Sequence, residues 1–142
     1  MKILIICTGN SCRSQMAAAL LKAFDADLKV YSAGTHPSES VHPKAVLVMQ
    51  EWDIDISQNK PRQLLELTNQ TFDYVITVCD SAKESCPVFT GSVRKRLHIG
   101  FDDPAEAKGT DDEVTAVFRS IRNKILIDFF SFYRNEISNT SC

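Results

Sequence analysis

Residues 3–14 read Ile-Leu-Ile-Ile-Cys-Thr-Gly-Asn-Ser-Cys-Arg-Ser, an apolar run that passes directly into a Cys-x5-Arg-Ser motif. The apolar run has the length and composition of a buried parallel strand, which we place at residues 2–6. The turn that follows contains Gly9 and Asn10, two residue types that tolerate unusual backbone angles. Apolar residues then recur at helical spacing, which predicts a helix at residues 14–24. The segment therefore predicts a strand, a tight loop and a helix, the basic unit of an α/β fold.

The loop in this unit has the features of a binding site for a tetrahedral oxyanion. Backbone N–H groups point inward between a strand end and a helix start, where the helix dipole also favours negative charge. Arg13 adds a planar, permanently charged fork, and these positive surroundings favour the thiolate form of Cys7. A buried structural role is the commoner fate of a cysteine, but the place of the motif between strand and helix favours a nucleophile. We therefore expect the substrate to be held by Thr8, Gly9, Asn10, Ser11, Cys12 and Arg13.

The composition indicates one globular domain that spans residues 1–142. Apolar residues make up 44% and charged residues 24% of the chain, as in ordinary soluble proteins. The net charge of −2 gives no general attraction to nucleic acid or to anionic membranes. The N-terminal apolar run is too short for a signal peptide, and no stretch reaches the length of a transmembrane helix. We therefore expect a cytoplasmic monomer that binds neither nucleic acid nor membranes.

The rest of the chain alternates strand-like and helix-like patterns. Strands are expected at residues 28–32, 74–78 and near 96–99. Helices are expected from residues 42–43 onward and around 62–67, and a capping box from Thr110 to Glu113 opens a long final helix. This alternation predicts an α/β fold with an open four-stranded parallel sheet and helices on both faces. We interpret the apolar stripe of the final helix as core, and residues 138–142 as a frayed tail in which Cys142 is incidental.

Three reactive residues follow three of the expected strands. Cys7 follows the first, Cys79 the third, and Asp103 the fourth within a few residues. Ligands of open α/β sheets bind outside the carboxyl ends of the strands, so these side chains should gather on one edge. Asp103 is then the candidate general acid for a departing oxygen, with a backbone restricted by Pro104. The alternative is that this Asp-Pro pair merely begins a turn.

Cys79 and Cys86 form a second informative pair. In a helix, seven residues would separate their Cα atoms by about 10 Å of rise, whereas a disulfide needs about 7 Å or less. Asp80, Ser81 and Pro87 make the segment a poor helix, so we hypothesise that it changes from compact to looped-out on oxidation. The alternative is that both are ordinary cytosolic thiols.

The five cysteines also bear on metal binding. Four residues separate Cys7 from Cys12 and six separate Cys79 from Cys86, unlike paired Cys-x2-Cys knuckles, and the three histidines lie elsewhere in the sequence. This spacing disfavours a structural zinc site, so we expect no bound metal.

Together these residues resemble the thioredoxin-coupled arsenate reductase family, which is built on the low-molecular-weight protein tyrosine phosphatase fold. The resemblance spans nearly the whole chain, and its motifs are residues 7–17, 31–34, 53–57, 78–80, 86–87 and 100–104. The combination is specific, whereas the first loop alone is shared with the phosphatases.

The resemblance implies a relay of three cysteines. Arsenate lies in the first loop, Cys7 attacks arsenic while Asp103 protonates the leaving oxygen, and Ser14 helps to hold the Cys7 thiolate. Cys79 then attacks Cys7, so that two electrons pass to arsenic and arsenite leaves. Cys86 attacks Cys79 and moves the disulfide to this second pair, where thioredoxin reduces it. The resemblance thus implies thioredoxin as an external reductant, with glutaredoxin as the alternative, and no bound cofactor. Phosphate and sulfate are expected to bind as analogues of arsenate.

One feature departs from the family pattern. Some members bind potassium near the loop through an Asn, a Ser and a Thr-x-Asp pair. Asn10 and Ser32 match this set, but Lys60 and Arg62 stand where the Thr and Asp are expected. Because a lysine ammonium can replace the cation, we expect activity that does not depend on potassium.

Two other functions stay open at this point. A low-molecular-weight phosphatase acting on phosphotyrosine would use Cys7, Arg13 and Asp103 identically through a phosphocysteine, with Cys12 as a protective thiol. Residues 105–107, Ala-Glu-Ala, lack the aromatic side chains that such phosphatases usually carry here, and the second cysteine pair would have no function. Weak phosphatase side activity is compatible with the reductase. The other alternative is a non-enzymatic redox sensor that binds oxyanions, for which the sequence supplies no partner surface.

Overall fold

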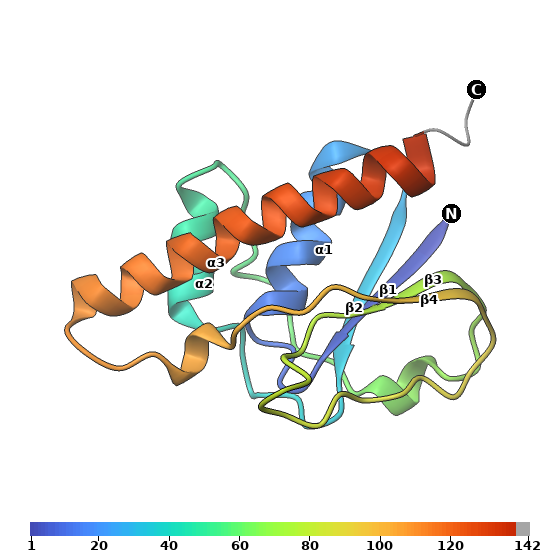
Figure 1. The fold of residues 1–142 in the computed structure, drawn as a ribbon, viewed down its shortest axis with the longest axis horizontal. Coiled ribbons are helices and arrows are strands. Elements are labelled where there is room, and N and C mark those ends of the chain that lie inside the picture. Colours follow the sequence, from blue (N-terminus) through green and yellow to red (C-terminus); the bar gives the residue numbers. More distant parts are fainter. Residues whose placement is uncertain (139–142) are drawn as a thin grey trace.

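The computed structural model describes residues 1–138 and shows one parallel sheet flanked by helices (Figure 1). Its strands are β1 (Lys2–Cys7), β2 (Lys29–Gly34), β3 (Phe72–Thr77) and β4 (Val93–His98), in the order β2-β1-β3-β4. The α-helices are α1 (Arg13–Phe24), α2 (Pro43–Gln50) and α3 (Asp111–Phe132). The short elements are the 3-10 turns η1 (Leu64–Leu67) and η2 (Pro104–Glu106) and the π-helical turn η3 (Tyr133–Ile137). All strand pairs are parallel, which confirms the expected four-stranded parallel sheet.

The helices begin where local chemistry favours them. Pro43 occupies the first turn of α2, and the ring of His42 accepts the N–H of Lys44 at 3.1 Å. The expected capping box opens α3, because Thr110 and Glu113 exchange side-chain bonds of 3.2 and 3.3 Å with each other's N–H groups. Both starts match the sequence analysis.

The edge strand β4 is less visible in the sequence. It begins at Val93, whereas the apolar pattern suggested a strand near residues 96–99. Arg94, Lys95 and Arg96 are exposed and charged, as is common on a sheet edge, so the strand has little apolar alternation at its start.

The two faces of the sheet are covered unequally. All three α-helices pack on one face, where a large core joins side chains such as Ile5, Met16 and Phe118. The other face carries a smaller cluster that includes Leu4, Leu64 and Phe89 and is covered by η1 and the chain after β3. Figure 1 shows the helices on one side of the sheet and η1 on the other. Helical segments therefore lie on both faces as expected, but on one face the helical part of the cover is the short 3-10 turn η1.

The sheet order places β1 beside β3, and this arrangement positions the reactive residues. Ile6 pairs with Thr77, and the N–H of Val78 donates to Ile6 at 2.9 Å, so both chains leave the sheet at the same edge. Of the expected tail at residues 138–142, all but Ser138 lie outside the described residues, Cys142 included. Within residues 1–138, no helix has the length and apolar character needed to cross a membrane.

Candidate active site

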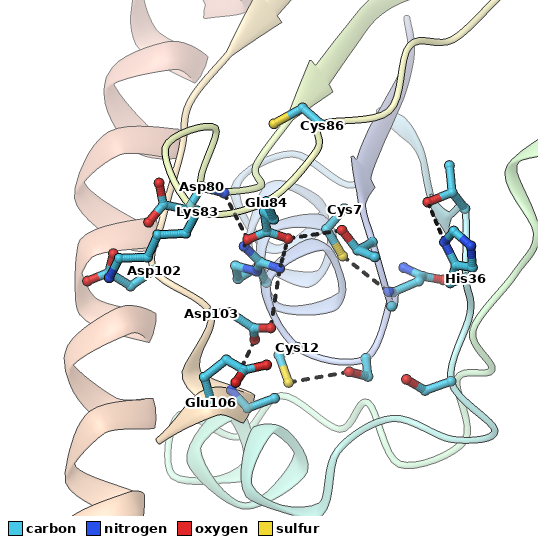
Figure 2. Close-up of a pocket in the computed structure, with 18 of the residues that line it drawn as sticks. Cys7, Cys12, His36, Asp80, Lys83, Glu84, Cys86, Asp102, Asp103 and Glu106 are labelled. Atoms are coloured by element: carbon cyan, nitrogen blue, oxygen red, sulfur yellow. Dashed lines mark hydrogen bonds and ion pairs between the residues drawn. The ribbon is translucent and has the colours of Figure 1, made fainter. Parts of the chain in front are cut away.

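The loop between β1 and α1 surrounds the sulfur of Cys7 with hydrogen-bonding groups (Figure 2). The Asn10 N–H donates to Cys7 Sγ at 3.2 Å, and Ser14 Oγ lies 3.0 Å from the same sulfur. Asn10 Nδ2 donates to Ser14 Oγ at 2.7 Å, which leaves the Ser14 hydroxyl proton available to Cys7. The structure thus brings together the expected nucleophile and the residue expected to hold it.

The turn in this loop is made by Asn10. Its φ of 52° lies in the left-handed region, and its Oδ1 accepts the N–H of Arg62 at 2.9 Å. Within residues 1–138 only Gly109 among the glycines has a positive φ, so of the two turn residues Asn10, and not Gly9, adopts the left-handed conformation. Gly9 instead leaves room for Ser38, whose Oγ would lie 3.1 Å from an added Cβ.

Gly34 at the end of β2 sets the position of the loop from behind. A Cβ atom at this position would lie 2.3 Å from the backbone oxygen of Thr8, a distance that real atoms do not tolerate. A glycine is therefore required for the loop to pack against the neighbouring strand.

Arg13 is nearly fully buried and points into the loop, with 3% of its side chain exposed. Its Nη1 donates to the carbonyl of Phe101 at 3.2 Å, and its Nη2 lies 3.6 Å from Asp103 Oδ2. Burial alone would lower the pKa of Arg13, but hydrogen bonding to Glu84 and the charge of Asp103 outweigh burial and raise it. The guanidinium is therefore a permanent positive charge at the base of the site.

Glu84 is the functional residue that the sequence analysis missed. Its carboxylate takes both arms of the Arg13 fork, at 2.5 and 3.0 Å, and accepts the Thr8 hydroxyl at 2.9 Å. Burial opposes the charged form, but the bonds from Arg13 and from the Asp80 N–H outweigh it and lower the pKa of Glu84 to about 2. A tetrahedral oxyanion needs the same guanidinium edge, so Glu84 has to move aside before such a ligand can bind the fork. Glu84 lies in a turn and has no motif around it that would have indicated this role.

Asp103 both begins a turn and faces the site. Its Oδ1 accepts the Ala105 N–H at 3.0 Å at the start of η2, while its Oδ2 is the atom that faces Arg13. The two interpretations of the Asp-Pro pair are therefore compatible. A half-buried carboxyl beside the anion fork is suitably placed to give a proton to a departing oxygen.

Cys12 lines the same site as a neutral thiol. Burial raises the pKa of Cys12 to about 12, and its sulfur lies 3.5 Å from Ser11 Oγ. Among the described residues, Cys7 and Cys12 are free and buried.

Cys79 and Cys86 form a disulfide with a Cα–Cα separation of 5.8 Å. Cys79 is buried two residues after the end of β3, whereas Cys86 is half-buried and reaches the surface. The chain between them consists of turns rather than a helix, and Asp80 Oδ1 accepts the Ala82 N–H at 3.0 Å. This pairing agrees with the geometric argument that the two sulfurs meet only where the segment is not helical.

An open cleft of about 1120 Å³ joins these parts. The Cys7 loop forms its floor, and Cys86, Glu84 and Asp103 line its walls (Figure 2). The three segments expected to meet at the carboxyl edge of the sheet therefore do meet. Behind the loop, Ser32, Lys60 and Arg62 line a separate pocket, which is the region where a potassium ion was considered.

The fold and the site define a class of protein. The model of the low molecular weight phosphotyrosine protein phosphatase family matches residues 2–126. The chain therefore belongs to this family, as the sequence motifs indicated.

Within the family, several of the similar proteins are arsenate reductases. The arsenate reductase of Halalkalibacterium halodurans is 47% identical over 124 residues, which cover 87% of this chain and 88% of that protein. A solved arsenate reductase in the phosphate binding state superimposes with a TM-score of 0.72 at 28% identity, covering 92% of this chain and 95% of the other. A thioredoxin-dependent arsenate reductase of Corynebacterium glutamicum gives a TM-score of 0.61 at 25% identity, covering 95% of this chain and 63% of the other.

Proposed function

We propose that this protein reduces arsenate to arsenite through Cys7, Cys79 and Cys86, and that thioredoxin restores it. The observation that carries the proposal is the Cys79–Cys86 disulfide, whose Cys86 lines the cleft that holds the Cys7 loop. A phosphatase needs the loop and the acid but has no use for a second cysteine pair. The arsenate reductases among its relatives support the same choice.

The first step forms a covalent bond between sulfur and arsenic. The Cys7 thiolate attacks arsenic, one As–O bond breaks, and the departing oxygen takes a proton from Asp103 and leaves as water. Backbone N–H groups of the loop and the Arg13 guanidinium hold the remaining oxygens. Arg13 is free to do so once Glu84 has withdrawn.

The next two steps move electrons and then a disulfide. The Cys79 thiolate attacks Cys7 Sγ, and the electron pair of the S–As bond passes to arsenic, which leaves as arsenite. Cys86 then attacks Cys79 Sγ and Cys7 departs as a thiolate, so the disulfide now joins Cys79 to Cys86. Arsenic has gained two electrons, and Cys79 and Cys86, the resolving pair, have together lost two.

The last step needs a dithiol from outside. Cys86 is the accessible sulfur of the pair and is the one that an external thiolate can attack. Thioredoxin is the proposed reductant, with support from the thioredoxin-dependent relative, and glutaredoxin is the alternative. The proposal includes no bound cofactor, a cytoplasmic location where reductant is plentiful, and a monomer.

A second candidate function is hydrolysis of aryl phosphates, which the family match favours. The Cys7 loop and Asp103 would perform both reactions, because phosphate and arsenate have nearly the same shape and charge. Ala105, Glu106 and Ala107 line the cleft where an aromatic wall for phosphotyrosine would be expected. We therefore assign phosphatase chemistry as a weak side activity.

The deciding experiment follows NADPH consumption by the purified protein with thioredoxin, thioredoxin reductase and arsenate. Turnover should be lost in both Cys79→Ser and Cys86→Ser, while hydrolysis of an aryl phosphate persists in both. Arsenate-dependent turnover that survives either substitution would contradict the relay. Absence of arsenate turnover in the unmodified protein, with intact hydrolysis, would identify a phosphatase.

A further inference from the structure

The fold brings His98 beside the resolving disulfide. His98 ends β4 and pairs with Thr77, the last residue of the neighbouring strand β3, two positions before Cys79. One ring nitrogen of His98 and the two sulfurs of Cys79 and Cys86 all lie within 4.8 Å of one another. The cysteine spacing and the distant histidines disfavoured zinc in the sequence, but the parallel pairing of β3 with β4 brings His98 close to the cysteine pair.

The imidazole ring of His98 is oriented so that one of its nitrogens can bind a metal ion. Its Nδ1 lies 2.7 Å from the Thr77 hydroxyl, which in turn donates to the Leu97 carbonyl at 3.5 Å. In the tautomer with its proton on Nδ1, the Thr77 hydroxyl accepts the Nδ1–H of His98. This leaves Nε2 with a free lone pair, and metal-binding histidines are commonly oriented by such a bond on the other nitrogen.

The looped-out arrangement of the segment suits the two sulfurs for zinc once the S–S bond is broken, and bound zinc would hold the reduced segment in this arrangement. Without the S–S bond, two sulfurs relax to van der Waals contact at about 3.7 Å. Two thiolates on a tetrahedral Zn²⁺, with Zn–S of about 2.3 Å, are separated by about 3.8 Å. The Cα–Cα separation of 5.8 Å therefore suits a shared zinc ion nearly as well as a disulfide.

The cluster is also open to solvent. Cys86 and His98 line a cavity of about 410 Å³ on the outer face of β3 and β4, together with Ser81 and Pro87. Cys79 is buried and holds the site from below. An ion can enter through this cavity, and a water molecule has room to complete a four-coordinate shell.

We propose that the reduced Cys79–Cys86 pair and His98 form a regulatory site for a thiophilic divalent cation, and that this cation is Zn²⁺. Binding requires prior reduction of the disulfide by a dithiol or a phosphine, and the two thiols release their protons as they coordinate. A thiolate held by zinc cannot attack Cys7, so the metal stops the relay without touching the Cys7 loop. This regulatory consequence rests on the proposed function, whereas the binding itself does not.

The binding test uses Cys7→Ser/Cys12→Ser/Cys142→Ser, in which the resolving pair supplies the only thiols. Zn²⁺ affinity is measured by competition with a chromophoric chelator, and the coordination sphere by the absorbance of the Co²⁺ form. The phosphine-reduced protein should bind one ion per chain with a sulfur-to-cobalt charge-transfer band, and the oxidised protein none. Equal binding in both redox states would overturn the proposal.

His98→Ala tests the third ligand, with His36→Ala as the matched control. Both histidines are exposed, so neither substitution should affect folding, and His36 lies on the far wall of the main cleft. His98→Ala should weaken Zn²⁺ binding by about 10- to 100-fold or more and blue-shift the cobalt bands, while His36→Ala leaves both unchanged. An unchanged Zn²⁺ affinity in His98→Ala would show that only the two thiols bind the ion, and this would contradict the proposal.

A final measurement links the site to turnover. Zn²⁺ should inhibit arsenate reduction by the full chain, and EDTA should reverse the inhibition. With each protein's rate expressed as a fraction of its own zinc-free rate, the inhibition constant should be at least tenfold higher in His98→Ala than in the unmodified protein. Inhibition that is the same in His98→Ala would place the inhibitory ion elsewhere and overturn the regulatory role. If the chain did not reduce arsenate, the proposed function would fail while the binding result stood.

Discussion

The loop after β1 and the segment after β3 leave neighbouring strands at the same edge of the sheet, yet they are held very differently. In the first loop, Asn10, Arg13 and Ser14 are almost wholly buried and bond to one another, to the nucleophile or to distant parts of the chain. In the second, residues 81–83 and 85 are exposed turns, held at their ends by the disulfide and inside by Glu84.

The difference matches the two tasks that we assign to them. Stabilising the charge of a reacting oxyanion requires donors that are fixed before the substrate arrives. Transferring a disulfide from the cleft to a reductant requires a sulfur that exchanges its bonding partner and moves to a different environment. A rigid site and a segment of low local stability are therefore expected side by side.

The largest effect should come from removing the Asp103 carboxyl, because this impairs the reaction at the oxyanion and leaves transfer of the disulfide to the reductant intact. Asp103→Asn should lower the rate of arsenite formation in a single turnover by about 10²- to 10⁴-fold. The rate at which thioredoxin reduces the oxidised protein should stay the same. The neighbouring Asp102→Asn is the matched control, and a loss of similar size there would contradict the role of Asp103.

Amide hydrogen exchange sharpens the comparison directly. Reduction of the disulfide should change protection across residues 79–90 by about 10-fold or more, since the segment rearranges between looped-out and compact forms. Protection of residues 7–14 should remain within about twofold, because only two of its side chains, Thr8 and Arg13, bond to the rearranging segment, both through Glu84. Unchanged exchange across residues 79–90 would rule out the conformational switch.

The contact that joins the two regions is the Arg13–Glu84 pair, and removing its charge should expose the anion site. Glu84→Gln should raise the affinity of the oxidised protein for phosphate by about tenfold, measured by calorimetric titration, because a neutral amide competes less well for the guanidinium. Glu106→Gln is the control, since Glu106 lines the same cleft but is not a partner of Arg13. Equal effects in the two variants would show a general charge effect of the cleft.

The same pair has a defined pH dependence. The folded chain holds the pKa of Glu84 near 2, below its ordinary value of 4.5. The pair therefore stabilises the fold at every pH above about 4.5, and its contribution fades as the pH falls toward 2. Glu84→Gln should accordingly flatten the acid limb of the unfolding curve.

The smallest effect is expected from potassium. Replacing sodium by potassium at equal ionic strength should change the reductase rate by less than twofold, because Lys60 stands beside the pocket behind the loop. Lys60→Thr/Arg62→Asp supplies the oxygen ligands of the potassium-binding family members and should create a dependence. A severalfold rise with potassium in the unmodified protein would contradict this expectation.

The sequence was informative where local pattern and function coincide. The strand, loop and helix around Cys7 have strong periodicity and turn signals, and the parallel sheet rule correctly predicted that Cys79 and Asp103 lie nearby. Glu84 and His98 could not be found in this way, because an exposed turn and a charged edge strand have no periodicity that reveals their partners. Their roles come from contacts across 71 residues, to Arg13, and across the β3–β4 pairing. The unequal cover of the two sheet faces was hidden for the same reason, since a short 3-10 turn gives almost the same pattern as a helix.

Glu84 lies between Cys79 and Cys86, which are seven positions apart and joined by the disulfide, so its carboxylate is tethered next to Arg13. A tethered group competes at an effective concentration that for short tethers reaches the millimolar range. Any dissolved oxyanion has to exceed that concentration, or bind much more tightly, to enter the oxidised site. The spent enzyme thus carries its own competitive ligand, and abundant phosphate gains access to the cleft only after the reductant has released the tether.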